Sequence, residues 1–309
     1  MATLPLLVPD IVSLHQLTES SSRPARTYLI DRLDIRLPST PEQLTNEIPI
    51  EISSLESWRL GTSLLQQYRN TASPEQLAEW HQAQQLNGTL PPLELAKTAL
   101  AGIDREVETL FAAVPNLAWL IAQSDTLPID LHLNASGPEP AHVRLVDTLT
   151  NIAGDILVRV DFKRPRPRFN IGAALDLAAA VLTQPERDWQ ALLVTRGTSK
   201  NKATALRLVP VEQQRVVAAQ ALLDIALGLR LQALREPVPL FESASQKLFR
   251  SGTFDETPYE KDLGDQHTNF LWGHITADEI MSPAGGGRAQ ALAEALWGAY
   301  DAFTQELSP

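Results

Sequence analysis

The sequence predicts a mixed α/β protein in which an N-terminal helical portion and a C-terminal helical cap flank a central core. Helical periodicity dominates the first third of the chain, alternating apolar residues replace it after position 128, and long apolar helical segments return after position 210. We expect the corresponding boundaries at residues 1–90, 91–209 and 210–309. The 309 residues, 44% of them hydrophobic, suffice to bury a core in one large domain or two smaller ones.

The N-terminal portion is predicted to consist of successive helices. Apolar residues recur at helical spacing in Ser53–Tyr68, Pro74–Gln85 and Leu93–Ala113. Ser73 is a good helix start, because a serine side chain caps free N–H groups and the proline after it suits the first turn. Gly88 indicates a helix end.

The pattern changes to strands after residue 128. Apolar and polar residues alternate in three consecutive segments, as expected of half-buried strands, around Ile129–Leu133, Val143–Asp147 and Ile156–Val160. Ile171–Leu182 is apolar on nearly every side, which predicts a buried helix with Asn170 as its cap.

Two more strands and two helices complete the prediction. In chain order they are Trp189–Arg196, Ala205–Val209, Val211–Leu234 and Arg288–Glu306. The prolines of REPVPLF end the first of these helices, because proline lacks the N–H group that a helix interior needs.

The order of strand, helix and strand has a consequence for the loops. A strand that follows such a crossover lies parallel to the strand before the helix, and the connection is right-handed. The loops that leave the two strands then emerge at the same edge of the sheet. We therefore expect Lys163–Arg168 and Arg196–Lys202 to lie close together.

These two loops hold an unusual share of the positive charge. The chain has 26 Lys and Arg against 37 Asp and Glu, a net charge of −11, which argues against a free-standing nucleic-acid-binding protein. Arg159–Arg168 nevertheless holds five basic residues and one acid, and Arg196–Arg207 holds four basic residues and no acid. The sequence thus describes an acidic protein with two basic segments.

The basic segments allow two interpretations. Either they are solvated loops, or they contact phosphates, because Arg and Lys on loops bind the DNA backbone without reading its sequence. The second interpretation gives seven candidate DNA-binding residues: Lys163, Arg164, Arg166, Arg168, Arg196, Lys200 and Lys202. Pro165 and Pro167 are expected to hold the first segment extended. Phe162 and Phe169 are expected to anchor it in the core, with base stacking as the alternative.

Two resemblances to known protein families favour one of these interpretations. The predicted order of helix, three strands, helix and strand is similar to the core of restriction-endonuclease-like nucleases of the PD-(D/E)XK type. More specific segments are RPARTYLIDRLDIRLP, IEISSLESWRLGTSLLQQY, GDILVRVDFKRPRPRF, LREPVPLFESASQKLF and NFLWGHITADEIM. In the same order and over nearly the whole chain, they resemble the C-terminal domain of RecC, the gamma subunit of exodeoxyribonuclease V (the RecBCD helicase–nuclease).

The resemblance to RecC implies a nuclease-like fold that has lost its chemistry. It implies a non-catalytic domain that contacts DNA, as a duplex end and as separated single strands, and that binds the helicase–nuclease subunits RecB and RecD. The complex would be an ATP-dependent helicase–exonuclease in double-strand-break repair by homologous recombination. ATP and Mg²⁺ would then act in the partner subunits, with no cofactor or metal held by this chain.

A Mg²⁺-dependent nuclease is the alternative hypothesis. Asp147 and Asp161, on neighbouring strands, would hold the ion and Lys163 would stabilise the developing charge, although Asp-X-Lys alone is a common pattern. By comparison with active relatives of the helicase–nuclease group, Leu65 stands where those enzymes carry a metal-binding histidine. Thr150 is an alternative match for their upstream aspartate. The three candidate residues are therefore interpreted as vestigial.

Composition also bears on the cellular context. The chain has no cysteine, its first residues lack the basic start of a secretory signal, and no run reaches the ~18 apolar residues that a membrane span needs. We expect a cytoplasmic protein that does not bind membranes. A free-standing interaction module, with neither DNA contact nor catalysis, is a third hypothesis.

Overall fold

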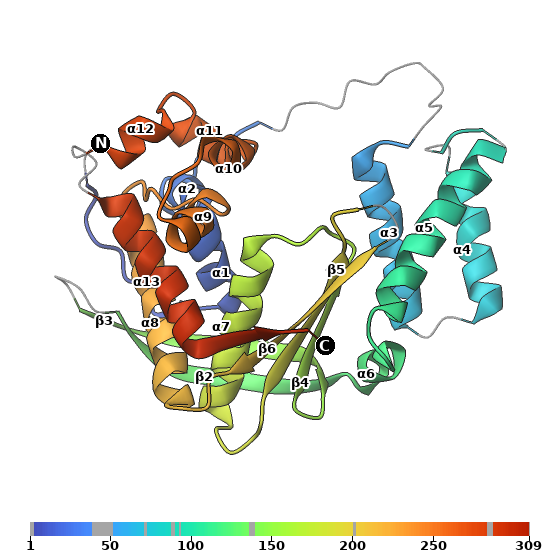
Figure 1. The fold of residues 1–309 in the computed structure, drawn as a ribbon, viewed down its shortest axis with the longest axis horizontal. Coiled ribbons are helices and arrows are strands. Elements are labelled where there is room, and N and C mark those ends of the chain that lie inside the picture. Colours follow the sequence, from blue (N-terminus) through green and yellow to red (C-terminus); the bar gives the residue numbers. More distant parts are fainter. Residues whose placement is uncertain are drawn as a thin grey trace.

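The protein folds as a mixed α/β structure built on one open sheet (Figure 1). The computed structural model describes residues 3–38, 52–70, 73–87, 90–92, 94–135, 140–199, 202–282 and 287–308. The strands are β1 (Ile11–Val12), β2 (Asp125–Ala135), β3 (Ala141–Ala153), β4 (Ile156–Asp161), β5 (Gln190–Arg196), β6 (Ala203–Pro210) and β7 (Thr304–Leu307).

Helices precede, interrupt and follow these strands. The first group is α1 (Leu14–Ser22), α2 (Pro24–Arg26), the π-helical turn η1 (Thr27–Arg32), α3 (Ser54–Arg69), α4 (Pro74–Leu86), α5 (Glu94–Ala112) and α6 (Leu117–Gln123). The second group is α7 (Pro167–Thr183), α8 (Arg215–Ala233), α9 (Ala244–Ser251), α10 (Glu256–Asp262), α11 (Gln266–Trp272), α12 (Ala277–Met281) and α13 (Arg288–Phe303).

The sheet mixes parallel and antiparallel pairs. Its strand order is β1-β3-β4-β5-β6-β7, and β2 pairs with the other side of β3. The pairs β2–β3, β3–β4, β5–β6 and β6–β7 are antiparallel. β4 and β5, which α7 connects, are parallel, with Val160 opposite Val194. The predicted mixed α/β class and the predicted parallel crossover are confirmed.

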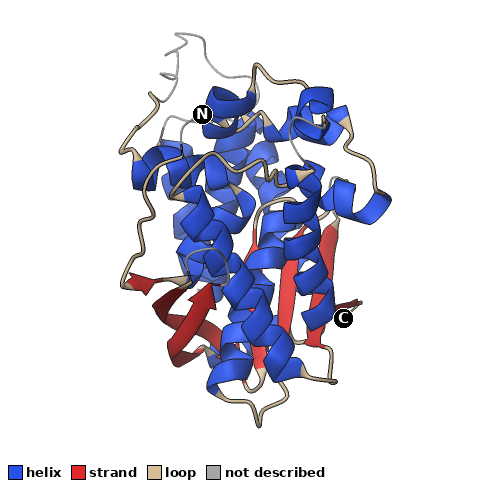
Figure 2. Ribbon diagram, turned by 90° about the vertical axis from the view of Figure 1, so that its left-hand side faces the viewer, coloured by secondary structure: helices blue, strands red, loops and turns tan. Residues whose placement is uncertain are grey.

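Helices cover both faces of the central strands. Leu157 and Leu193 pack into the cluster formed with α1, α7, α8 and α13. Val160 and Val194, which point the other way, pack into the cluster formed with α3, α5 and α6. Figure 2, which turns the left-hand side of Figure 1 towards the viewer, shows the helices on the side of α8 and α13 in front of the strands. α7 is enclosed in this layer. Its side chains are apolar on nearly every side, as predicted.

The C-terminal cap is organised around Phe241. The rings of Phe254, Tyr259 and Trp272 surround it at centroid distances of 5.8, 5.0 and 5.7 Å, with strongly inclined planes. The hydroxyl of Tyr259 contacts the carbonyl of Ile275, O···O 2.9 Å, and so ties α10 to the start of α12. The cap therefore holds the backbone at Phe241, and with it the next residue in the chain, in a fixed place.

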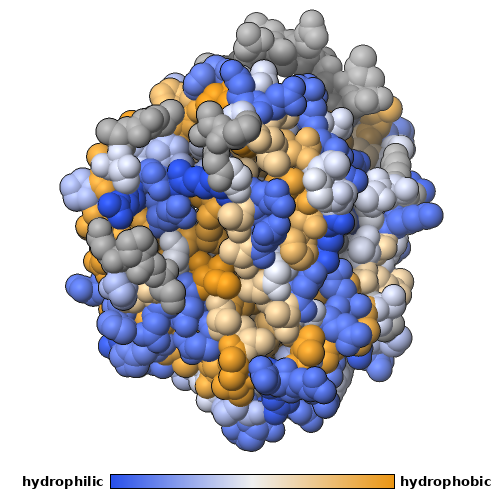
Figure 3. All heavy atoms as spheres, turned by 60° about the vertical axis from the view of Figure 1, so that its left-hand side comes forward, coloured by the Kyte–Doolittle hydropathy of each residue, from blue (hydrophilic) through white to orange (hydrophobic). Residues whose placement is uncertain are grey.

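α8 is the one helix in the described part of the chain whose length and composition would allow it to cross a membrane. Half of its most apolar stretch is buried in this structure. Leu223 and Leu227 belong to the main core, so packing accounts for the apolar composition. Figure 3, which brings the left-hand side of Figure 1 forward, shows apolar side chains on the face where α8 and α13 lie. Val216 and Val217, at the start of α8, are exposed.

Three local predictions need correction. α7 begins at Pro167, not near Ile171, and Asn170 is not its cap, because proline at the first helical position already has a suitable φ and needs no N–H. α13 ends at Phe303, and the following four residues pair with β6 as β7. β1, α6 and the short helices α9–α12 of the cap were not predicted as individual elements. The division at residues 90/91 and 209/210 stays a prediction.

Gly61 allows α3 to lie directly against the loop that follows β4. A Cβ atom at this position would lie 2.0 Å from Cε1 of Phe162. Phe162 is fully buried in the cluster that α3 shares with β4 and β5, so the prediction that it anchors the basic segment is confirmed. Phe169 is partly buried against the opposite cluster.

We predict that Gly61→Ala destabilises the protein by about 1–3 kcal/mol, because the enclosed Phe162 ring has no free space into which to move. Urea unfolding followed by circular dichroism measures the change. Gly102→Ala is the matched control, since no atom lies within 4 Å of a Cβ built in this other helix. It should gain roughly 0.5–1 kcal/mol through helix propensity. Equal effects of the two substitutions would contradict the close contact.

Candidate functional site

The parallel pairing of β4 and β5 brings the two basic segments together. Asp161 at the end of β4 lies opposite Thr195 of β5. Immediately beyond, the N–H of Arg196 donates to the carbonyl of Lys163, N···O 2.9 Å. The N–H of Gly197 donates to the carbonyl of Lys202 at 2.6 Å, which joins the two ends of the second segment. The predicted convergence of the two loops is confirmed.

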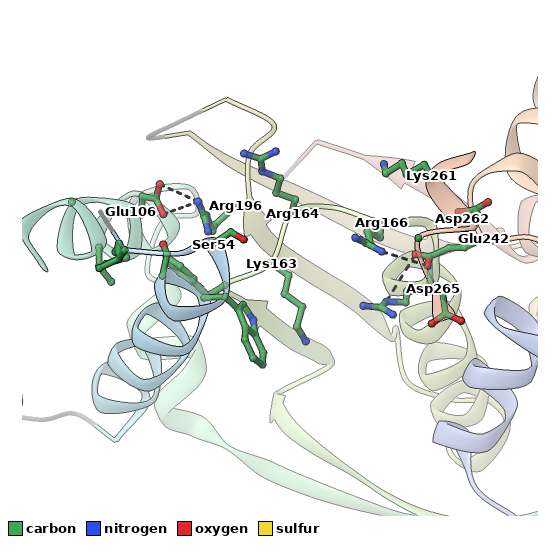
Figure 4. Close-up of a pocket in the computed structure, with 18 of the residues that line it drawn as sticks. Ser54, Glu106, Lys163, Arg164, Arg166, Arg196, Glu242, Lys261, Asp262 and Asp265 are labelled. Atoms are coloured by element: carbon green, nitrogen blue, oxygen red, sulfur yellow. Dashed lines mark hydrogen bonds and ion pairs between the residues drawn. The ribbon is translucent and has the colours of Figure 1, made fainter. Parts of the chain in front are cut away.

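A cleft of about 1280 Å³ lies at this edge of the sheet (Figure 4). α3 and α5 form one wall, the cap between residues 241 and 268 forms the other, and the segment after β4 lies between them. We call it the central cleft. Its basic lining residues are Arg23, Arg105, Lys163, Arg164, Arg166, Arg168, Arg196 and Lys261. Its acidic lining residues are Glu106, Glu242, Asp262 and Asp265. A positive excess therefore gathers in an otherwise acidic chain.

Arg196 is held by the helical wall. Its Nη2 lies 3.0 Å from Oε2 of Glu106 on α5 and donates to the other carboxylate oxygen at 3.1 Å. Its guanidinium also lies over the ring of Phe162, 4.5 Å from the centroid. Both charged side chains are mostly buried. Arg196 therefore ties β5 to α5, and little of it faces the open cleft.

Arg166 and Arg168 face one carboxylate of the cap, that of Glu242. The closest N···O distances are 4.0 Å from Arg166 and 3.9 Å from Arg168, longer than a contact ion pair. The backbone N–H of Arg168 donates to Oε1 of Glu242 at 3.4 Å. Burial raises the pKa of Glu242 above its ordinary value, against the effect of the two arginines. Burial lowers the pKa of Arg168, because it disfavours the charged guanidinium just as it disfavours the charged carboxylate.

The remaining candidate cations differ in how they are engaged. Nζ of Lys163 donates to Asp161 at 3.1 Å and lies 5.6 Å from the ring centroid of Trp58. Arg164 and Lys202 are exposed and form no ion pair with any residue in the described ranges. Lys200 lies outside the described residues. Of the seven predicted DNA-binding residues, Arg164 and Arg166 thus present the most accessible charge to the central cleft.

The helical wall of the central cleft has an apolar part beside the polar side chains of Ser54, Ser57 and Thr98. Ile52, Trp58, Leu95 and Ile103 line it. The indole N–H of Trp58 is buried, and no hydrogen-bond acceptor for it is found among the described residues. The cleft therefore combines a partly apolar wall, a basic floor and an acidic wall on the cap side.

The candidate nuclease residues all have hydrogen-bond or ion-pair partners within the protein. Oδ2 of Asp147 accepts a hydrogen bond from the N–H of Leu14 at 2.9 Å, so this carboxylate serves the start of α1. Asp161 is paired with Lys163. Where β4 continues beyond its pairs with β3, Nη2 of Arg69 donates to the carbonyl of Val160 at 2.6 Å. Among the described residues, no group of three or more His, Asp or Glu side chains is placed to hold a metal ion.

The structure corrects one expectation about the basic segment and adds two residues. Pro167 opens α7, so Arg168 lies in a helix and only the residues before Pro167 are extended. Glu106 and Glu242, which neutralise the converged arginines, were not predicted. Glu106 follows the helical pattern of α5, and Glu242 lies far along the chain, so no spacing rule connects either with the basic segments.

Comparisons with known proteins relate most of the chain to one family. Residues 9–253 match the family model of the RecC C-terminal domain. The chain is 28% identical over 196 residues to RecBCD enzyme subunit RecC of Mycolicibacterium smegmatis, covering 62% of this chain and 17% of that protein. It is 26% identical over 210 residues to the subunit of the same name in Mycobacterium tuberculosis, covering 67% and 18%. The chain thus spans less than a fifth of these relatives. Since the family match covers most of the chain, it belongs to the RecC C-terminal domain family.

Proposed function

We propose that the central cleft holds a DNA strand and that this domain performs no chemistry of its own. The observation that carries the proposal is the basic segment Lys163–Arg168, which lines one cleft of an acidic protein beside Arg196 of the second segment. Arg164 and Arg166 offer exposed guanidinium groups to phosphates there. The apolar wall around Trp58 would then face the bases.

The setting we propose is a RecBCD-type helicase–exonuclease that acts in double-strand-break repair by recombination. The named relatives are RecC subunits of the RecBCD enzyme, and this chain matches less than a fifth of each. RecB-like and RecD-like subunits would bind the domain and supply ATP hydrolysis, Mg²⁺ and strand cleavage. We also propose that the core is a nuclease-like scaffold, supported by its helix, three strands, helix and strand in that order. Co-purification with such subunits from cell extract tests membership of the complex.

Neutralising the exposed arginines should weaken DNA binding. We predict that Arg164→Gln with Arg166→Gln reduces the affinity for a fluorescein-labelled oligothymidylate about tenfold at about 50 mM salt, because two phosphate contacts are lost. The slope of log affinity against log salt concentration should fall by roughly 1.4, since each contact to a single strand contributes about 0.7. Fluorescence anisotropy measures both quantities.

A control with the same charge change separates site binding from net charge. Arg36 and Arg144 are exposed arginines that do not line the central cleft. Their double substitution by glutamine should leave affinity and salt slope near those of the unchanged protein. If both double variants bind DNA equally, the cleft is not the DNA site.

The non-catalytic part of the proposal has its own test. Asp147 and Asp161 both have partners within the protein, so we predict that the chain leaves single-stranded DNA intact in the presence of Mg²⁺. Denaturing gel electrophoresis of an end-labelled oligonucleotide measures this. Cleavage that depends on Mg²⁺ and disappears in Asp161→Ala would support the alternative nuclease, with Lys163 stabilising the charge.

A further inference from the structure

The start of α7 is an anion-binding arrangement that the chain fills with its own carboxylate. Arg166 is the N-cap residue, and its side chain makes no capping hydrogen bond. Pro167 follows and has no N–H, so the N–H of Arg168 is the first available donor of the helix. Its acceptor is Oε1 of Glu242, 74 residues further along the chain. The positive end of the helix and two guanidinium groups thus surround one negative charge.

Glu242 lies at long distances from these cations, but the cap holds its backbone in place. Its ion-pair distances of 3.9 and 4.0 Å exceed the 3.0 Å between Arg196 and Glu106 on the opposite wall. The side chain of Glu242 is only 7% exposed, whereas that of Arg166 is 49% exposed. Phe241, the preceding residue, is fixed among the aromatic rings of the cap. Arg166 can therefore turn towards the cleft while Glu242 stays in place.

A phosphodiester and a carboxylate have the same charge and each presents two terminal oxygens. Arginine binds both groups through the same fork of N–H donors. A DNA phosphate that approaches Arg166 in the central cleft therefore meets an arginine that already faces a negative charge. It also meets repulsion from Glu242 itself, at a distance where unit charges near a protein surface interact appreciably.

We infer that Glu242 is an internal counter-ion of the central cleft, which competes with a bound phosphate for Arg166 and Arg168 and thereby limits the affinity for DNA. The inference rests on the proposed function, because it requires a strand in the cleft. A reduced affinity suits a DNA strand that must move past the domain. The carboxylate of Glu242 reduces the affinity while the arginines remain in the cleft.

The test is Glu242→Gln, which removes the charge and keeps an oxygen that accepts from the N–H of Arg168. We expect the affinity for the labelled oligothymidylate to rise roughly fivefold at about 50 mM salt, with a salt slope steeper by about 0.7 because one more phosphate is neutralised. Asp188→Asn is the matched control: Asp188 is exposed and lies just before β5, at the end of that strand away from the cleft. It should change neither quantity.

A second comparison leaves Glu242 untouched and so does not depend on the folding of the variant. Arg164 has no ion-pair partner among the described residues, whereas Arg166 faces Glu242. Arg164→Gln should therefore weaken binding more than Arg166→Gln does, although both are exposed arginines on one segment. Equal losses, or unchanged or weaker binding by a folded Glu242→Gln protein, would overturn the inference while DNA binding itself stands. Absence of DNA binding by the unchanged chain would instead overturn the proposed function.

Discussion

The parallel alignment of β4 and β5 is the constraint on which the rest of the site depends. It places two chain segments that are rich in arginine and lysine at one sheet edge, and the hydrogen bond from Arg196 to the carbonyl of Lys163 fastens them together. Like charges brought this close repel each other, more strongly where water is partly excluded. The fold therefore needs acidic side chains at the same place, and sequence neighbours do not supply enough of them.

The required acids come from opposite sides of the cleft. Glu106 on α5 meets Arg196 at contact distance, whereas Glu242 of the cap meets Arg166 and Arg168 at about 4 Å. The tight pair is enclosed and joins α5 to the sheet, so removing one partner would leave a buried charge unpaired and destabilise the protein. Glu242 neutralises part of the charge of Arg166 and Arg168 without closing the cleft. The basic edge thus acts as the electrostatic link between the helical wall and the cap.

The sequence predicted the framework of this site better than its details. Alternating residues in Ile156–Val160 followed by an apolar helix and a second strand were enough to predict the parallel pair, because crossovers obey a handedness rule. The segment after Asp161 was predicted to be extended, because its two prolines favour an extended conformation. Pro167 instead starts a helix, where its missing N–H has no cost. Glu242 could not be predicted, because only the packing of Phe241 in the cap brings it to the start of α7.

Under the proposed function, the same contacts favour holding a DNA strand over cutting it. A metal-dependent site needs carboxylates that are free to converge on an ion. In this chain Asp147 accepts a hydrogen bond from the start of α1, Asp161 pairs with Lys163, and Arg69 donates to the carbonyl of Val160 beside them. Protein cations therefore supply the positive charge at this edge of the sheet. A fixed cation attracts a phosphate but activates no water, and this is the property that the proposed non-catalytic role requires.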